Sequence, residues 1–308
     1  MRSAFSRRGF LGSLGAGLIV SPGRVRSSQS IQGAGQGNLR LAFHTDIHAD
    51  EKAETFAALE MAAEAINAQN TDLVLCGGDL IGGGFTSTPQ RMAPRWNAYL
   101  GMARSIHGDQ HAVIGNHDLV GARPSDGSAA MADPRREFKD NLGLDRTYGS
   151  FDALGYRFIL LDSLRISREV QMYDGWVSTE QRDWLRVLLS STPADMPIVL
   201  LSHMPLLTAF FSATEGGTYP AQRNRVVINN VEVLELFAGY NLVLVLQGHL
   251  HVTEEIYWRG TTFLTGGAVC GKWWRGGAYF GTSEGFTMIT LGNNRIEWEY
   301  LGYGWNDR

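Results

Sequence analysis

The chain has 308 residues, of which 44% are hydrophobic and 19% are charged. These values are typical of a globular protein with a sizeable core, and they argue against a disordered chain, a collagen-like repeat or a coiled coil. No apolar run approaches the roughly 20 residues that a membrane-spanning helix requires, so no integral membrane span is expected. The two cysteines are too few for a disulfide scaffold or a thiolate-rich zinc cluster.

Charge is distributed unevenly along the chain. Residues 1–38 carry five arginines and no Asp or Glu, whereas the whole chain has a net charge of −4. The rest of the chain is therefore more acidic than the total suggests. Because an acidic body disfavours binding to phosphate backbones, we expect no long nucleic acid among the partners.

The first segment has the layout of an export signal. Arg7 and Arg8 are followed by Phe10 and Leu11, and then by an uncharged, glycine-rich stretch over 12–20. This pattern resembles the bacterial twin-arginine signal, which implies the twin-arginine export machinery as a partner and a periplasmic or extracellular location. No A-x-A-like cleavage site stands out before residue 38, so a retained N-terminal anchor stays open. A disordered basic tail or a buried first helix is the alternative.

The remainder alternates predicted strands and helices without an internal linker. We therefore divide the chain into a signal segment and linker over 1–38 and a single domain over 39–308. Phe56, Leu59, Ala63 and Ile66 recur at spacings of three and four, which predicts one helix. Ser178 begins an S-x-x-Q capping box that predicts the start of another. The apolar runs that predict buried strands are 41–43, 73–76, 112–114, 198–201 and 242–246.

Other segments are expected to form less regular structure. A strand pair is predicted over 148–152 and 156–162, with a turn between them. Residues 119–147 are rich in Gly, Pro, Asp and Arg, and they are expected to form a long loop or a partial cap. The stretch 261–301 is expected to alternate short strands with glycine-rich turns.

Each of the five apolar runs is followed by residues that bind metal ions. Strand carboxyl ends converge on the ligand crevice in open α/β sheets, so these side chains are expected to meet in space. Carboxylate oxygens, imidazole nitrogens and an amide oxygen suit Mn²⁺, Fe or Zn²⁺ better than Mg²⁺. With Asp79 bridging, the set would serve two divalent ions about 3.5–4 Å apart. The candidate ligands are Asp46, His48, Asp79, Asn116, His203, His249 and His251.

At these positions the sequence resembles the calcineurin-like metallophosphoesterase superfamily, whose pattern is D-x-H, G-D, G-N-H-[DE], H and G-H-x-H. The corresponding residues are Asp46-Ile47-His48, Gly78-Asp79, Gly115-Asn116-His117-Asp118, His203 and Gly248-His249-Leu250-His251. The match is complete over residues 40–251. It implies an α/β fold, a four-layer α/β/β/α sandwich of two mostly mixed β-sheets flanked by helices, with the metal site at the strand carboxyl ends. Residues 39–308 would then be a metallophosphoesterase domain.

The resemblance also implies an activity, the hydrolysis of phosphodiester or phosphomonoester bonds in a small phosphorylated substrate. A hydroxide bridging the two ions would attack phosphorus in line. His117 would stabilise the phosphoryl group or protonate the leaving oxygen, with Asp118 orienting it. The first ion would be held by Asp46, His48 and His251, the second by Asn116, His203 and His249, and both by Asp79.

Departures from the family pattern narrow this expectation. Gly82 stands where purple acid phosphatases carry a tyrosine, so a coloured tyrosinate–iron centre is not expected. The protein Ser/Thr phosphatases carry G-D-x-x-D-R-G, but here Asp79 is followed by Leu80 to Gly83. Protein phosphatase activity is therefore not expected. The stretches 148–152, 158–163 and 175–185 resemble the class III cyclic nucleotide phosphodiesterase branch. That branch name covers varied substrates, so cyclic AMP itself is not implied.

Residues 271–277, directly after Cys270, contain two tryptophans and two basic residues among glycines and belong to none of these motifs. Trp273 and Trp274 offer stacking surfaces for a base or sugar, and Arg275 could meet a phosphate, which makes them candidate substrate-binding residues. A packed C-terminal loop is the alternative. Cys76 is expected to be a small core residue, and a disulfide between Cys76 and Cys270 stays open.

The sequence also allows one alternative to the hydrolase function. The same fold could serve as a non-catalytic binding or scaffold protein with a dead site. All seven ligands and His117 are present, and this favours the enzyme.

Overall fold

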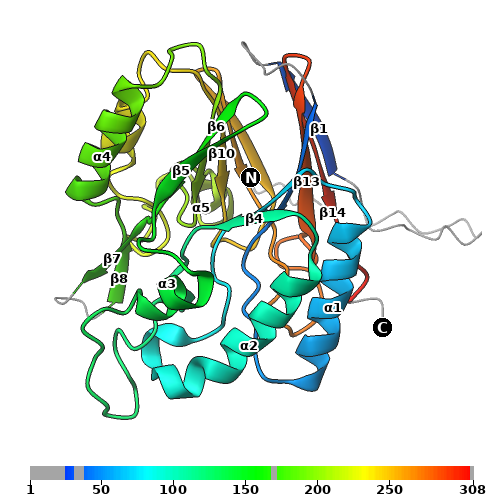
Figure 1. Ribbon diagram of the computed structural model, residues 1–308, viewed down its shortest axis with the longest axis vertical. Helices are drawn as coiled ribbons and strands as arrows, with labels where there is room; N and C mark the ends of the chain where they lie inside the picture. Colours follow the sequence, from blue (N-terminus) through cyan, green and yellow to red (C-terminus); the bar gives the residue numbers. More distant parts are fainter. Residues whose placement is uncertain (1–24, 31–37, 168–171, 306–308) are drawn as a thin grey trace, which may run out of the picture.

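Two six-stranded sheets pack face to face in the computed structural model, which describes residues 25–30, 38–167 and 172–305 (Figure 1). The predicted twin-arginine motif at Arg7 and Arg8 lies outside the described residues. Within the described ranges, the helices include none with the length and apolar character of a bilayer span.

The first sheet has the strand order β1-β14-β13-β2-β3-β4. Strands β2, β3 and β4 are parallel, while β13 pairs antiparallel with both β2 and β14. The strands are β1 (Val25–Ser30), β2 (Leu39–His44), β3 (Leu73–Cys76), β4 (Asp109–Ala112), β13 (Phe286–Gly292) and β14 (Arg295–Leu301).

Two strands of this sheet differ from the prediction. The apolar residues Val113 and Ile114 lie just beyond β4 rather than within it, because β4 is an edge strand whose own residues are polar and partly exposed. At the opposite edge, Val25–Ser30 pairs antiparallel with β14. Part of the segment predicted to be signal and linker therefore adds a strand to the domain.

The second sheet has the order β11-β12-β10-β9-β6-β5, and its four central strands are parallel. The predicted strands near 198 and 242 and the predicted strand pair near 150 are all confirmed. A separate hairpin follows β6. The strands are β5 (Gly149–Ala153), β6 (Tyr156–Leu161), β9 (Ile198–Ser202), β10 (Leu242–Gln247), β11 (Glu254–Trp258) and β12 (Thr261–Thr265), and the hairpin is β7 (Leu164–Ser167) with β8 (Met172–Gly175).

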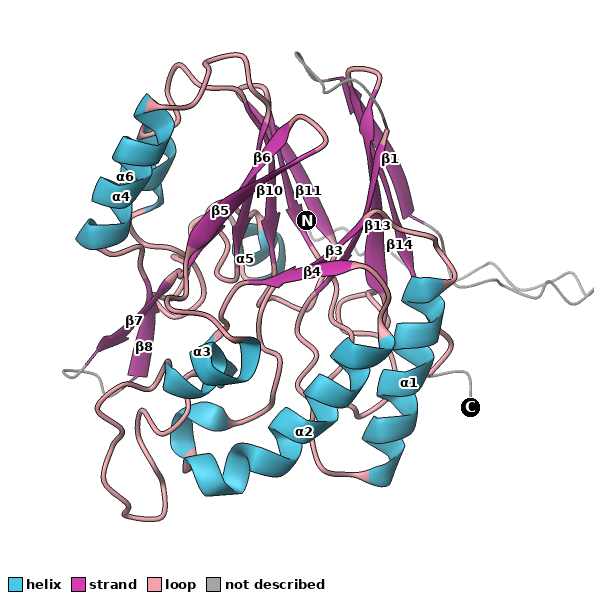
Figure 2. Ribbon diagram, in the orientation of Figure 1, coloured by secondary structure: helices cyan, strands magenta, loops and turns pink. Residues whose placement is uncertain are grey.

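Alternate residues of the central strands face two different layers. Phe43, Leu75 and Phe158 are fully buried between the two sheets, whereas Ala42 and Val74 face the helices. Helices α1 (Ala53–Asn67) and α2 (Pro89–Ser105) cover the first sheet, and α4 (Thr179–Ser190) and α6 (Asn230–Glu235) cover the second (Figure 2). The predicted four-layer α/β/β/α sandwich is confirmed.

Short helices lie in the loops at the carboxyl ends of the parallel strands. The segment 119–147, predicted as a loop or partial cap, contains α3 (Arg136–Leu142) among turns and loop. The others are α5 (Phe210–Thr214) and two 3₁₀ turns, Gly84–Thr86 and Asn116–Asp118. Because β2, β3, β9 and β10 all end on this side, the residues that follow them can share one site.

The start of α4 provides a test of the fold. The Ser178 hydroxyl accepts a hydrogen bond from the Gln181 backbone N–H, as the capping-box pattern predicts for that half of the motif. Ser178→Ala should lower the free energy of unfolding by about 1 kcal/mol, measured by urea denaturation. Ser190→Ala, at the exposed end of the same helix, is the control and should change it by less than about 0.5 kcal/mol. Equal effects would contradict the capping role.

Candidate metal centre

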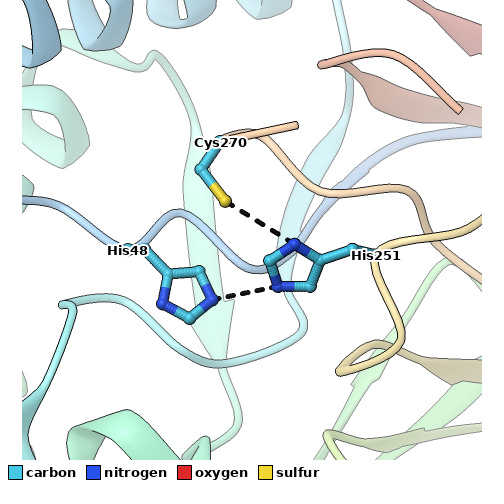
Figure 3. A group of neighbouring side chains, drawn as sticks. All are labelled: His48, His251 and Cys270. Atoms are coloured by element: carbon cyan, nitrogen blue, oxygen red, sulfur yellow. Dashed lines mark hydrogen bonds between the residues drawn. The ribbon is translucent and has the colours of Figure 1, made fainter. Parts of the chain in front are cut away.

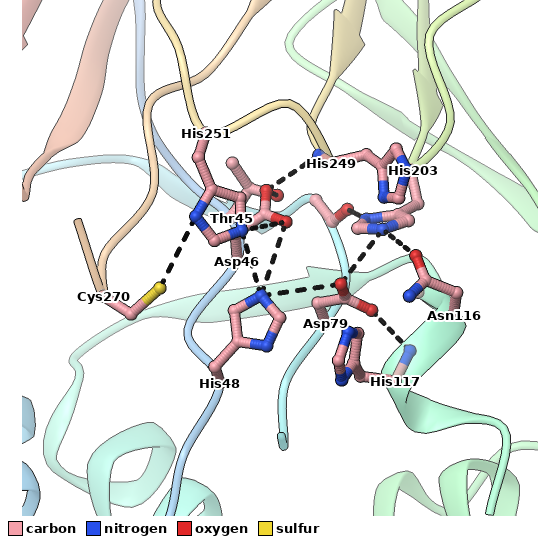
Figure 4. A network of polar contacts seen from close by, with 12 residues as sticks. Thr45, Asp46, His48, Asp79, Asn116, His117, His203, His249, His251 and Cys270 are labelled. Atoms are coloured by element: carbon pink, nitrogen blue, oxygen red, sulfur yellow. Dashed lines mark hydrogen bonds and ion pairs between the residues drawn. The ribbon is translucent and has the colours of Figure 1, made fainter. Parts of the chain in front are cut away.

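All seven predicted ligands come together at the carboxyl ends of the parallel strands (Figure 4). They come from five separate segments of the chain. All seven residues are buried, with at most 6% of the surface of each exposed. Buried imidazoles and carboxylates in this density are unfavourable unless they are paired or bind cations. The cluster divides into two groups that share Asp79.

The first group consists of Asp46, His48 and His251. The Nε2 atoms of the two histidines lie 3.0 Å apart, and His251 Nε2 lies 3.3 Å from Asp46 Oδ1. Ligand atoms bound at about 2.1 Å to one ion, at roughly right angles, have this separation. Asp46 Oδ1 is buried and has no hydrogen-bond partner among the described residues. The residues therefore fit a metal ion at this position.

Neighbouring groups orient these ligands. Asp46 Oδ2 accepts hydrogen bonds from the Thr45 hydroxyl at 2.8 Å and from the His249 backbone N–H at 2.9 Å, which leaves Oδ1 for the ion. His251 Nδ1 lies 3.0 Å from the Gly271 carbonyl oxygen. A proton on Nδ1 makes that hydrogen bond and keeps the lone pair of Nε2 on the side of the metal.

The second group consists of Asn116, His203 and His249, again with Asp79. His203 Nε2 lies 3.1 Å from Asn116 Oδ1, while His203 Nδ1 lies 2.7 Å from the Gly77 carbonyl oxygen. His249 Nε2 is 3.0 Å from the Asn224 carbonyl oxygen, so its Nδ1 remains for ligation. In both histidines a backbone carbonyl fixes the tautomer that a metal requires.

Asp79 lies between the two groups. Its Oδ2 is 3.6 Å from His48 Nε2 and 3.3 Å from His203 Nε2, and its Oδ1 accepts a hydrogen bond from the His117 backbone N–H at 2.7 Å. One carboxylate thus faces both positions where an ion would sit. This is the arrangement of a bridging ligand in a two-metal site.

The charges of the cluster also favour cations. Burial alone would raise the pKa of Asp46 and Asp79, but the neighbouring histidines reverse this and lower both. Burial lowers the pKa of His203, but Asp79 and Asp46 outweigh it and raise the value to about 9. The carboxylates are therefore ionised, and a metal ion binding at His203 would displace a proton.

The backbone at the ligands adopts an unusual conformation. Five of the seven lie in the left-handed region that non-glycine residues rarely occupy. Gly248 has no room for a side chain, because a Cβ there would lie 2.2 Å from the Thr45 hydroxyl oxygen. The strain and the close packing turn successive side chains toward one point. The five residues and their φ angles are Asp46 (54°), His48 (46°), Asp79 (54°), His249 (72°) and His251 (56°).

His117 lies at the edge of the cluster with a defined tautomer. Its Nδ1 accepts a hydrogen bond from the Gly83 backbone N–H at 2.8 Å, so its proton is on Nε2. Its ring meets the His48 ring edge-on at 4.6 Å. Burial, only partly offset by Asp79, lowers the pKa of His117 to about 4. The neutral ring is therefore a hydrogen-bond donor at Nε2.

Asp118 occupies a different environment from the one predicted. Its Oδ1 accepts from the backbone N–H groups of Leu80 and Ile81, and its Oδ2 accepts from that of Gly115. These bonds join the loop after β3 to the loop that carries Asn116. It is Gly83, and not Asp118, that orients the His117 ring. Asp118 is thus a positioning residue for the two loops.

Cys270 is a neighbour of the site that no sequence motif indicated. Its Sγ lies 3.8 Å from His251 Nδ1, and it forms a group with His48 and His251 that could hold a metal ion (Figure 3). Its backbone N–H also donates to the Asp46 carbonyl oxygen. Cys270 and Cys76 are both buried and free, so the disulfide that the sequence left open is not formed in this structure.

The three predicted substrate-binding residues have different positions. Trp273 stacks on the His251 ring at a centroid distance of 4.4 Å. Trp274 is partly buried, and its indole N–H donates to the His48 carbonyl oxygen at 2.9 Å. It therefore holds the backbone of a predicted metal ligand in place and does not face a substrate. Arg275 is exposed and does not line the cavity next to the metal centre.

That cavity brings in residues that the sequence did not single out. Phe210, Tyr219, Arg225, Tyr279 and Phe280 line it together with His249 and Trp273. They come from two stretches about 60 residues apart in the chain. Neither stretch carries a metal-binding motif, so no local pattern indicated them.

Comparison with known proteins agrees with this geometry. The sequence model of the calcineurin-like phosphoesterase family matches residues 39–253, which is more than half of the chain. No curated protein matches the chain significantly.

Solved structures show the same fold at low sequence identity. A dimetal phosphatase from Danio rerio has a TM-score of 0.62 at 15% identity, with 86% of this chain and 96% of that chain covered. A purple acid phosphatase from yellow lupin (Lupinus luteus) seeds has a TM-score of 0.55 at 14% identity, with 87% and 52% covered. GAP50, the anchor in the inner membrane complex of Plasmodium, has 0.53 at 14% identity, with 86% and 85% covered.

The family match covers every one of the seven ligands and His117, and in the structure Asp79 lies between the histidines of the two ligand groups. The family is one of metal-dependent phosphoric ester hydrolases. This chain therefore belongs to the calcineurin-like phosphoesterases.

Proposed function

We propose that this protein hydrolyses phosphodiester or phosphomonoester bonds at a centre of two metal ions. The position of Asp79 is the observation that carries the proposal, because a single buried carboxylate faces both groups of ligands. A site for one ion would not need a shared ligand of this kind. The Danio rerio neighbour, which is described as a dimetal phosphatase, is consistent with this activity.

The donor set limits which ions the site would hold. Imidazole nitrogens outnumber carboxylates, and one amide oxygen joins them, which suits Mn²⁺, Fe or Zn²⁺. Two ions held by these residues would supply an activated water as the nucleophile and would neutralise charge on the phosphoryl oxygens. The protein holds the ligands in place through backbone carbonyls at Gly77, Asn224 and Gly271.

His117 stabilises the transferring phosphoryl group. The ring has one proton, on Nε2, and a pKa lowered to about 4 by burial. Giving that proton up would leave an imidazolate anion, which is unfavourable beside Asp79. The neutral ring therefore acts by donating a hydrogen bond to a phosphoryl or leaving oxygen. Of the two roles expected from the sequence, this favours stabilisation over protonation.

The alternative function is a non-catalytic binding or scaffold protein. The fold by itself allows it, since GAP50 of Plasmodium is described as an anchor. The orphaned Asp46 Oδ1 and the facing Nε2 atoms of His48 and His251 argue against it here, because a site without metal has no need of them.

Asp79→Asn tests the two-metal hydrolase. The amide cannot bridge two ions with its negative charge, so turnover should fall by at least about 10³-fold. Hydrolysis of bis(p-nitrophenyl) phosphate and of p-nitrophenyl phosphate by the Mn²⁺-loaded protein measures this, and the ratio of the two rates gives the bond preference. The exposed Asp126→Asn is the matched control and should keep full activity. A wild-type protein that binds no metal and hydrolyses neither ester would support the binding-protein alternative.

His117→Ala tests the role of the imidazole separately from metal binding. We expect kcat to fall by about 10²- to 10³-fold while the metal content, measured by atomic emission, stays near two ions. His107→Ala, at an exposed histidine outside the motifs, should leave both quantities unchanged. Loss of both metals in His117→Ala would show that the residue is a ligand instead.

We further propose that the protein acts outside the cytoplasm. The support is the sequence of residues 1–38, with Arg7 and Arg8 ahead of an uncharged stretch. Residues 1–38 fused to a reporter should direct it to the periplasm through the twin-arginine machinery. Replacing both arginines by lysine should abolish this export. A reporter that stays in the cytoplasm with the native arginines would contradict the proposal.

A further inference from the structure

A cavity of about 150 Å³ opens directly beside the metal centre. His249, a ligand of the second ion position, lines it, and Trp273 on its other side stacks on His251, a ligand of the first. A group attached to a phosphorus atom at the metals would therefore enter this cavity first. Its lining also includes Phe210, Glu215, Arg225, Tyr279 and Phe280.

One wall of the cavity is a continuous run of aromatic rings that begins at the metal ligand His251. The rings of Trp273 and Tyr279 are 5.1 Å apart, those of Tyr279 and Phe280 are 4.8 Å apart, and those of Phe280 and Phe210 are 5.1 Å apart. Phe280 is nevertheless 60% exposed and Trp273 is 37% exposed. Aromatic side chains that pack on one another but keep faces open to solvent offer a surface for another flat ring.

The other side of the cavity supplies polar groups of two kinds. Arg225 lines the cavity together with His249, and the carbonyl oxygen of the preceding residue, Asn224, accepts from His249 Nε2. Among the described residues, no carboxylate lies within ion-pair distance of Arg225. Glu215 lines the same cavity and is exposed. A cation suits phosphate oxygens, and a carboxylate accepts from hydroxyl or amino groups.

A flat ring, hydrogen-bond donors and a phosphate are the chemical features of a nucleotide. We infer that this cavity binds the nucleoside of a nucleotide substrate, with the base stacked on Phe280 and its neighbours and Arg225 contacting the phosphate. The inference rests on the proposed hydrolysis of phosphoesters and adds the class of substrate. It also assigns the recognition of the base to Phe280 and the phosphate contact to Arg225, rather than to Trp274 and Arg275.

Two pairs of substrates isolate the contribution of the nucleoside. AMP and ribose 5-phosphate share a 5′-phosphomonoester and differ by the base. The p-nitrophenyl ester of thymidine 5′-monophosphate and methyl p-nitrophenyl phosphate share a leaving group and differ by the nucleoside. In each pair, kcat/KM of the Mn²⁺-loaded protein should be at least about tenfold higher for the compound that carries the base.

Variants then locate the effect. Phe280→Ala should lower kcat/KM about tenfold for the base-bearing member of a pair and leave the base-free member unchanged. Arg225→Gln should weaken both members by about the same factor, with partial rescue in Arg225→Lys, because it acts on the phosphate that they share. Tyr257→Ala, at an exposed aromatic residue of β11 outside this cavity, is the control and should change neither.

Binding measurements separate failure of this inference from failure of the hydrolase proposal. By titration calorimetry with the metal-loaded His117→Ala protein, which is expected to keep its ions but turn over slowly, AMP should bind more tightly than ribose 5-phosphate, and adding Phe280→Ala should remove the difference. Equal affinities, or an equal loss for both compounds in Phe280→Ala, would overturn the nucleoside site even if both are hydrolysed. If AMP binds with the expected preference but none of the four esters is hydrolysed, the nucleoside site stands and the hydrolase proposal fails.

Discussion

The structure depends on burying two carboxylates, Asp46 and Asp79, at one point between the strand ends. Their charge is only partly met by hydrogen bonds, because Asp46 Oδ1 accepts none from the described residues, although His251 Nε2 lies 3.3 Å from it. Neighbouring histidines lower the pKa of both carboxyl groups, so both are ionised. Bound cations would neutralise the negative charge that remains. The left-handed backbone at five ligands and the crowding at Gly248 have a cost in stability that only a functional site explains.

Much of the fold and most of the metal site could be predicted from the sequence, for a physical reason. Each ligand follows directly after a continuous apolar run, so the position of the strand also fixes the position of the ligand. Parallel strands then bring these positions to one edge of the sheets without further information. The role of Asp118 was not predictable in this way, since it depends on which backbone N–H groups of the loop after β3 reach it.

Other features were missed because no local pattern carries them. Phe56 is one of the four apolar residues whose spacing predicted α1, yet it is 42% exposed while Thr55 is buried, because the packing against the sheet decides which face is covered. Most residues of β4 are polar, so the strand was predicted at the apolar residues 112–114 instead of at Asp109–Ala112. The cavity residues Arg225 and Phe280 meet only through the tertiary structure.

The pairing of β2 with β13 also has a consequence for how the protein is made. Strand β2 carries the chain into Asp46 and His48, and its neighbour β13 comes later in the chain than every predicted metal ligand. The Asp46 carbonyl oxygen likewise accepts from the backbone of Cys270. Contacts so distant in sequence form late during folding. The pairing of β2 with β13, next to Asp46 and His48, therefore forms only after the residues of all seven ligands have been synthesised.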